Sequence, residues 1–368
     1  MRNLKRVLSL VMMIAMLAGL MVVGAGAAYN DFTDKDEIQN KTAVQTLVEL
    51  NVIAGKEDGS YYDPQGLLTR AEAAKLVCVV LNGGKDPILS DPDYVSYKDT
   101  KDNWASAYIE YVTTRKIVAG DGQGNFMPNE TVTAAQLAKM LLVAIGYDAA
   151  YEGLVGNSWN SKADALANEN GLYDNLSGLV TSDPLNRDNA AQIIYNVLTA
   201  HLVRYKSAAD GVGVVADPQD ETVLSRFFNT NTVVGVILAN DVFTLQGGRG
   251  SSAAAKNKVK VSVRHINDIA TDAGTMLTLP VGATNDLVGL EVAIFVKNMG
   301  KTTESVIGAP IPTENNKVVS TRESLTSRDK AEDFLDNNGI ELGFGYRSAT
   351  LRGERCSLTA GREHDRPV

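Results

Sequence analysis

Apolar residues recur at helical spacing through roughly the first half of the chain. Ala73, Leu76, Val77 and Val80 are one to four positions apart, which places them on one stripe of a helix. A second stripe lies within residues 137–144, and segments 43–53 and 108–118 have similar spacing. This pattern predicts an N-terminal module of helices that each bury one face.

The helical segments form an internal repeat. Residues 68–76, with the sequence LTRAEAAKL, return in weaker form at 132–140 and again at 185–193. The separation from Thr69 to Thr133 is 133 − 69 = 64 positions, and from Thr133 to Asn186 it is 186 − 133 = 53. Because one short unit cannot bury its apolar face alone, the repeat predicts three units packed against one another.

Each repeated segment begins with a helix-capping pattern. Thr69 and Glu72 have the spacing of a capping box, and Thr133 and Gln136 repeat it. Asn186 is also a favourable N-cap residue. These positions therefore have a structural explanation and need no ligand.

The arginines that follow two of the caps lack such an explanation. A cation in the first turn opposes the helix dipole, so we expect no structural reason for Arg70 or Arg187. A guanidinium beside free helix amides suits a carboxylate. The alternative is an ion pair with a neighbouring acid, either Glu72 or Asp188. The second unit has Ala134 at this position, which puts its part in binding in doubt.

Beyond residue 202 the apolar pattern changes to a period of two. We expect strands, separated by turns, at residues 232–238, 242–245, 258–263, 275–279 and 290–296. Short strands with Gly-rich turns suggest a small sandwich or barrel. The fold class predicted for the chain is thus α+β, with a mainly α module followed by a small all-β domain.

The N-terminus has the pattern of a secretory signal peptide. Arg2, Lys5 and Arg6 precede an apolar run at 7–23, and small residues follow at 25–27. A membrane anchor is the alternative, because the run is close to the minimum length for a span. The small residues favour cleavage, so we expect an exported chain without a membrane span.

Composition and charge exclude several functions. The net charge of −9 argues against nucleic-acid binding. Cys78 lies among apolar residues, which favours a core position over a disulfide with Cys356. The histidines are far apart and no nucleophile or phosphate-loop motif is present. We therefore expect no catalytic residue, cofactor or metal. The loop at Asp121 resembles a calcium loop faintly, but a tight turn is favoured.

The repeat resembles the S-layer homology family, which has three repeats and a TRAE signature, over roughly residues 29–202. The resemblance implies packing about a pseudo-threefold axis and attachment of a secreted protein to the wall of a bacterium, typically Gram-positive. The implied ligand is a secondary cell wall polysaccharide, commonly pyruvylated; other S-layer subunits are further expected partners. Asp34 and Asp99 occupy the place of the family's early Asp, where they would cap the first helix or contact sugar hydroxyls. Trp104 and Trp159, near the starts of first helices, are either core residues or platforms for sugar rings.

The chain divides by these patterns into consecutive segments: a signal peptide at 1–28, repeats at 29–90, 91–148 and 149–204, a linker at 205–230, a β-rich domain at 231–322 and a tail at 323–368. The tail becomes rich in Arg from Phe344 onward, as a disordered tail or a truncated or frameshifted gene would explain. Two functions remain open at this stage. One is a non-catalytic anchor for a surface protein, and the other is an anchored enzyme, such as a glycan hydrolase.

Overall fold

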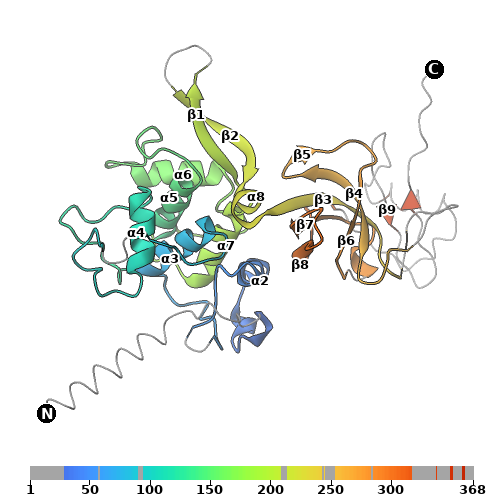
Figure 1. Cartoon of the computed structure of the whole chain (residues 1–368), viewed down its shortest axis with the longest axis horizontal. Helices are drawn as coiled ribbons and strands as arrows, with labels where there is room; N and C mark the ends of the chain where they lie inside the picture. Colours follow the sequence, from blue (N-terminus) through green and yellow to red (C-terminus); the bar gives the residue numbers. More distant parts are fainter. Residues whose placement is uncertain are drawn as a thin grey trace. The chain divides into compact units, whose positions relative to one another are not determined.

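The computed structural model describes residues 29–56, 59–89, 94–208, 214–242, 244, 253–282, 285–316, 337, 349–350 and 359–360. The predicted signal peptide and most of the predicted tail lie outside this part of the chain, so those assignments stay predictions. The chain separates into two compact units, Met1–Asn229 and Thr230–Val368 (Figure 1).

The first unit is built mainly from helices. Its elements in chain order are η1 Tyr29–Asp31, η2 Lys35–Glu37, α2 Lys41–Glu49, α3 Arg70–Leu81, α4 Ser106–Thr114, α5 Ala134–Ala144, α6 Trp159–Glu169, α7 Arg187–Val197, β1 His201–Ser207, β2 Val214–Thr222 and α8 Val223–Phe228. The three repeated segments are therefore the helices α3, α5 and α7.

The predicted caps are present at the start of each repeated helix. The Thr69 side chain accepts a hydrogen bond from the Glu72 amide, and the Glu72 carboxylate accepts one from the Thr69 amide. Thr133 and Gln136 form the same reciprocal pair. The Asn186 side chain caps α7 by accepting from the amide three residues on. These bonds satisfy amides that the helix itself leaves without a partner.

The predicted apolar stripes are buried. In α3, Ala73, Val77 and Val80 are at most 3% exposed, and in α5, Leu137 and Leu141 are at most 1% exposed. Each stripe faces a helix of another unit rather than of its own. The repeated helix α3 packs on α4, α5 packs on α6, and α7 packs on α2 (Figure 1). The order in which the units contact one another is therefore cyclic.

A ring of three backbone hydrogen bonds closes the cycle just before the caps. The amide of Leu68 donates to the carbonyl of Leu185 at 2.9 Å, Leu185 donates to Val132 at 2.8 Å, and Val132 donates to Leu68 at 2.9 Å. All three leucine and valine side chains are at most 2% exposed. Each unit thus donates to one neighbour and accepts from the other.

Residues 205–230, which the sequence suggested as a linker, contain regular structure instead. β1 and β2 pair in an antiparallel ribbon, and α8 follows β2 directly. The ribbon is attached to α5, because the Val203 amide donates to the Ile145 carbonyl at 2.8 Å. The alternating pattern in this segment was too polar to distinguish a ribbon from a loop.

The second unit contains an antiparallel sheet with the strand order β5-β4-β3-β7-β8, and β6 also pairs with β4. Its elements are β3 Thr230–Ala239, β4 Val259–Ile266, β5 Ile269–Ala270, β6 Met276–Leu279, η3 Asn285–Leu287, β7 Glu291–Lys297 and β8 Ser305–Pro312; β9 Ala349–Thr350 and β10 Thr359–Ala360 form a separate pair. The strands predicted around 232–238, 258–263, 275–279 and 290–296 are confirmed. Among the described residues β3 to β8 lie in one sheet, so these strands do not form the two packed sheets of a sandwich, and the barrel stays a prediction.

One face of this sheet carries the core of the second unit. Alternate residues of β3, β4 and β7 point into it, as the period of two requires. The cluster consists of Val233, Ile237, Val259, Val261, Val263, Leu279, Val281, Val288, Val292, Ile294 and Val296.

We expect Gly235→Ala to destabilise the second unit. A methyl group at Gly235 would lie 2.3 Å from the carbonyl oxygen of Ser262 and 2.9 Å from the Cα atom of Val263. Both are backbone atoms of β4, so the central strand pair would have to separate. The expected loss is about 1–3 kcal/mol of unfolding free energy, measurable by urea denaturation. Gly282→Ala is the matched control, because nothing lies within 4 Å of its added methyl; equal losses in both variants would contradict this explanation.

Candidate functional site

The amides at the helix starts are not free to bind an anion. The amide of Arg70 donates to the carbonyl of Glu130 at 2.8 Å, and the amide of Arg187 donates to the carbonyl of Gly66 at 2.9 Å. Both carbonyls belong to the loop before the repeated helix of another unit. The sequence-based expectation of open helix amides is therefore wrong, because neighbouring units use these groups to hold each other.

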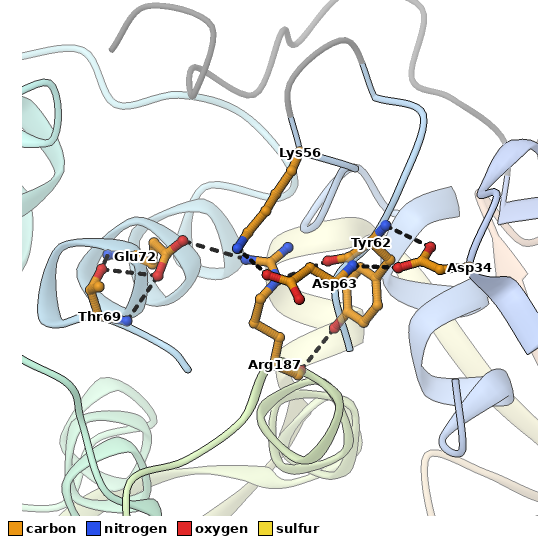
Figure 2. A network of polar contacts seen from close by, with 7 residues as sticks. All are labelled: Asp34, Lys56, Tyr62, Asp63, Thr69, Glu72 and Arg187. Carbon is orange, nitrogen blue, oxygen red and sulfur yellow. Dashed lines mark hydrogen bonds and ion pairs between the residues drawn. The ribbon is translucent and has the colours of Figure 1, made fainter. Parts of the chain in front are cut away.

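Arg187 also has a structural role, shown in Figure 2. Its Nε donates to the carbonyl of Tyr62 at 3.0 Å, its guanidinium lies 5.0 Å from the centre of the Tyr62 ring, and its Nη1 is 3.5 Å from a Glu72 oxygen. The Tyr62 hydroxyl donates back to the carbonyl of Arg187 at 2.8 Å. Only 4% of Arg187 is exposed. The expectation that structure gives no reason for this arginine is thus wrong, whereas the alternative pairing with Glu72 is present.

Arg70 occupies the equivalent position at the junction between the first and second repeats, but it is only partly buried. Its Nε donates to the carbonyl of Phe126 at 2.8 Å, Nη2 donates to the carbonyl of Ala119 at 3.2 Å, and the guanidinium lies 4.6 Å from the Phe126 ring centre. Within the described ranges no carboxylate lies at ion-pair distance from it. The carboxylates of Glu130 and Asp99 act on the Arg70 charge from beyond ion-pair distance, so the guanidinium has no direct carboxylate partner at this partly buried junction.

The second repeat differs because Ala134 stands where the other two repeats have an arginine. Its side chain is fully buried, and the next amide, that of Ala135, donates to the carbonyl of Thr181 at 3.1 Å. The loop of the third unit thus packs directly on the start of α5. This junction presents no guanidinium.

Asp34 and Asp99 accept hydrogen bonds from the loops whose carbonyls the two arginines contact. The Asp34 carboxylate accepts from the amides of Tyr62 at 2.8 Å and Asp63 at 2.7 Å (Figure 2). Asp99 accepts in the same way from the amides of residues 126 and 127, at 2.8 and 2.7 Å. Asp34 makes no side-chain cap to the short helix η2 that follows it. The option that this Asp caps a helix is therefore wrong, and contact with sugar hydroxyls stays a prediction.

Trp104 lies at the surface just before α4, with 37% of its area exposed. The ammonium of Lys75, from α3, lies 5.9 Å from the Trp104 ring and 5.3 Å from the Tyr108 ring, and the Tyr108 hydroxyl donates to Asp86 at 2.6 Å. Lys75 is only 3% exposed. Burial lowers the pKa of Lys75, and the charges of Asp86 and Glu72 oppose this shift.

Trp159, the first residue of α6, has a corresponding lysine contact one repeat later, although this lysine is half-buried whereas Lys75 is buried. The ammonium of Lys139, from α5, lies 4.9 Å from its ring, and burial lowers the pKa of this lysine too. Our sequence reasoning missed both lysines. The repeat could have revealed them, because 75 − 69 = 6 and 139 − 133 = 6 place each lysine six residues after its cap, where the third unit has Gln192.

Two further sequence expectations can be compared with the structure. Asp121 accepts from the amides of Gln123 at 2.7 Å and Asn125 at 3.0 Å, and hydrogen bonds from this turn lower its pKa to about 2. The prediction of a tight turn is confirmed.

Cys78 is fully buried, as predicted for a core residue, and burial raises the pKa of its thiol to about 12. In the described part of the chain no group of three or more His, Cys, Asp or Glu side chains could hold a metal ion, and no helix is long and apolar enough to span a membrane.

Comparisons with known proteins agree with the repeat. Residues 31–74 and 96–138 match the family model of the S-layer homology domain. The chain is 28% identical over 269 residues to an S-layer protein of Bacillus licheniformis, covering 70% of this chain and 29% of the relative. It is 28% identical over 261 residues to S-layer protein EA1 of Bacillus anthracis, covering 68% and 29%.

A third similarity is to an enzyme. An uncharacterized cell wall amidase of Bacillus anthracis is 34% identical over 132 residues, which are 35% of this chain and 24% of the relative. The chain spans less than a third of the length of each of these three relatives. Its first two helical units thus match the S-layer homology domain, and most of its length is similar to bacterial S-layer proteins.

Proposed function

We propose that the helical part of the chain is a non-catalytic anchor that holds an exported protein on the bacterial cell wall. It is made of three S-layer homology repeats about a pseudo-threefold axis. The two family matches and the similarity to S-layer proteins support the wall location. Inclusion of the third repeat is supported by its cap at Asn186 and by its place in the hydrogen-bond ring through Leu185.

The ligand we propose is a secondary cell wall polysaccharide that carries a carboxylate, such as a pyruvyl ketal. Arg70 is the observation that carries this proposal. Its guanidinium is fixed by two carbonyls, yet no carboxylate of the described residues lies within ion-pair distance of it. A planar guanidinium held in this way is well suited to bind a carboxylate through two parallel hydrogen bonds.

The other predicted site residues contribute to the same junctions in this proposal. Arg187, Asp34 and Asp99 shape the loops, and any direct sugar contact by them adds to that role. Trp104 and Trp159 supply ring faces for stacking. The second repeat binds the polysaccharide more weakly through its own helix start, because Ala134 replaces the arginine.

The anchoring proposal predicts where the protein is found. The chain without residues 1–28 should sediment with purified Gram-positive cell walls, and mild acid treatment that removes the secondary polysaccharide should abolish this. Walls from which only proteins have been extracted serve as the control. Equal sedimentation with stripped and unstripped walls would refute polysaccharide binding.

The similarity to a cell wall amidase supports a second candidate, an anchored enzyme. In that case the helical unit would hold a catalytic part near its substrate. Incubating the protein with wall glycans and measuring released sugars and new amino termini distinguishes the two functions. The non-catalytic proposal requires that neither is released above the level of a boiled sample.

We further propose that other S-layer subunits are partners of the assembled protein.

A further inference from the structure

Two lysines of this chain place their ammonium groups against aromatic rings, and of these Lys75 is buried and Lys139 half-buried. Lys75 is 3% exposed, and its ammonium lies 5.9 Å from the Trp104 ring and 5.3 Å from the Tyr108 ring. Lys139 lies 4.9 Å from the Trp159 ring. No carboxylate within the described ranges lies at ion-pair distance from either ammonium. Burying a charge is costly. The ring faces offset part of this cost, and the charges of Asp86 and Glu72 offset part of it at Lys75.

The repeats show that lysine and tryptophan occur together. The repeated helices of units one and two carry the lysine, and the helices they pack on carry Trp104 and Trp159 near their starts. In the third unit the same position is Gln192, and α7 packs on α2, which is preceded by residues 38–40 without a tryptophan. Helix packing alone therefore does not require the lysine, because the third junction forms without it.

The geometry determines which part of the indole remains available. Lys75 comes from the interior and is almost fully covered, whereas 37% of Trp104 is exposed. The ammonium thus lies beside a covered part of a ring that also has an area exposed to solvent. An exposed ring of fixed orientation is suited to stack on the apolar face of a sugar.

We propose that Lys75 and Lys139 are positioning residues that fix Trp104 and Trp159 as stacking platforms for sugar rings of the wall polymer. This inference rests on the proposed function, because it names how the same anchor holds its ligand. It gives two platforms, at the junctions of units one and two and of units two and three. The junction of units three and one has none.

The arrangement also makes binding depend on a proton. Burial lowers the pKa of both lysines below the usual 10.5, so they become neutral at a lower pH than exposed lysines. Asp86 and Glu72 act on Lys75 in the opposite direction, whereas burial is the cause of the lowered pKa at Lys139. The Tyr108 hydroxyl keeps its proton in this range because burial raises its pKa. Polymer binding should therefore weaken at alkaline pH.

The experiment uses the fact that the chain contains only two tryptophans. In a Trp159→Phe variant, Trp104 is the only indole, so its fluorescence reports the first junction alone. The probe is purified secondary wall polysaccharide, titrated at neutral pH and at about pH 10. Lys75→Gln and Lys75→Arg are compared in this background, with Lys206→Gln as a control because that side chain is 61% exposed.

We expect polymer to change the Trp104 emission in the Trp159→Phe background. Lys75→Gln should weaken binding about tenfold and alter the emission of the free protein, whereas Lys75→Arg keeps both. At about pH 10 the parent should lose affinity while Lys75→Arg does not, because arginine stays charged. Gln192 shows that this helix position accepts glutamine in a buried site, and thermal melts confirm folding of each variant.

Several results would overturn the inference. Full-strength binding by Lys75→Gln with an altered emission would show that the lysine orients an indole that does not touch the ligand. An emission unchanged by polymer would do the same. If Arg70→Ala still abolished binding in either case, the anchoring proposal would survive without the platforms. Equal binding of all variants to stripped and unstripped walls would contradict both the stacking platforms and the anchoring proposal.

Discussion

Replacing Arg187 with alanine should lower the free energy of unfolding by about 3 kcal/mol. The substitution removes a guanidinium that is 4% exposed and that joins the third unit to the first through Tyr62 and Glu72. The Tyr62 carbonyl would lose its donor, and the space between α7 and the loop of the first unit would be left without packing. Urea denaturation followed by far-ultraviolet circular dichroism measures the loss.

Arg70→Ala provides the matched comparison for this first prediction. The two arginines hold equivalent positions, but Arg70 is only partly buried, and its bond to the carbonyl of Ala119 lies at the surface. Its replacement should lower the unfolding free energy by about 1 kcal/mol or less. Similar losses in both variants would show that burial does not separate the two sites, which would contradict the structural role assigned to Arg187.

Arg70→Ala should have its main effect on binding. Loss of one charge-assisted contact corresponds to about 1.5–3 kcal/mol, or roughly a 10- to 150-fold rise in Kd for the wall polysaccharide. Thr69→Ala is the partner variant, because it removes the N-cap of the same helix and should lower stability by about 1 kcal/mol without a comparable change in Kd. Calorimetric titration and thermal melts on both variants give the two quantities.

The carboxylate on the polymer can be tested in the same titrations. Polymer whose pyruvyl groups have been hydrolysed should bind wild-type protein and Arg70→Ala with equal, weak affinity. A large difference between the two proteins on that polymer would show that Arg70 recognises something other than the carboxylate. Unchanged affinity of Arg70→Ala for the native polymer would leave stacking by Trp104 as the main source of binding.

The local features of the fold could be predicted from the sequence because their partners are close in the chain. The capping box of Thr69 and Glu72 joins residues three positions apart. The strand β4 follows from the alternation of Val259, Val261 and Val263. In each case one short window contains both the cause and the effect.

The arginines could not be interpreted in that way because their partners belong to other units. Arg187 and Tyr62 are 125 positions apart, and Arg70 and Phe126 are 56 apart. A rule about helix ends considers only the first turn and finds the cation unfavourable there. The packing of one unit's loop onto another unit's helix supplies carbonyls that no local rule contains.

Lys75 and Lys139 form an intermediate case. Their position after the cap is visible in the sequence, yet a lysine in an amphipathic helix is usually solvent-exposed. Only the neighbouring repeat covers this position, by placing Trp104 or Trp159 against it, and Lys75 is buried as a result while Lys139 is half-buried. Comparison of the three units at one position, including Gln192, would have shown that two of them differ from the third.

The hydrogen-bond ring of Leu68, Val132 and Leu185 fixes the number of units. In an open solenoid each added unit extends the array and leaves a terminal face for the next one. Here the third repeat hydrogen-bonds back to the first, so within the described residues the ring of three repeats has no open end to which a fourth could be added. Evolution of such an anchor can therefore change the chemistry of a single junction, as Ala134 and Gln192 illustrate, but it cannot lengthen or shorten the array without opening the ring.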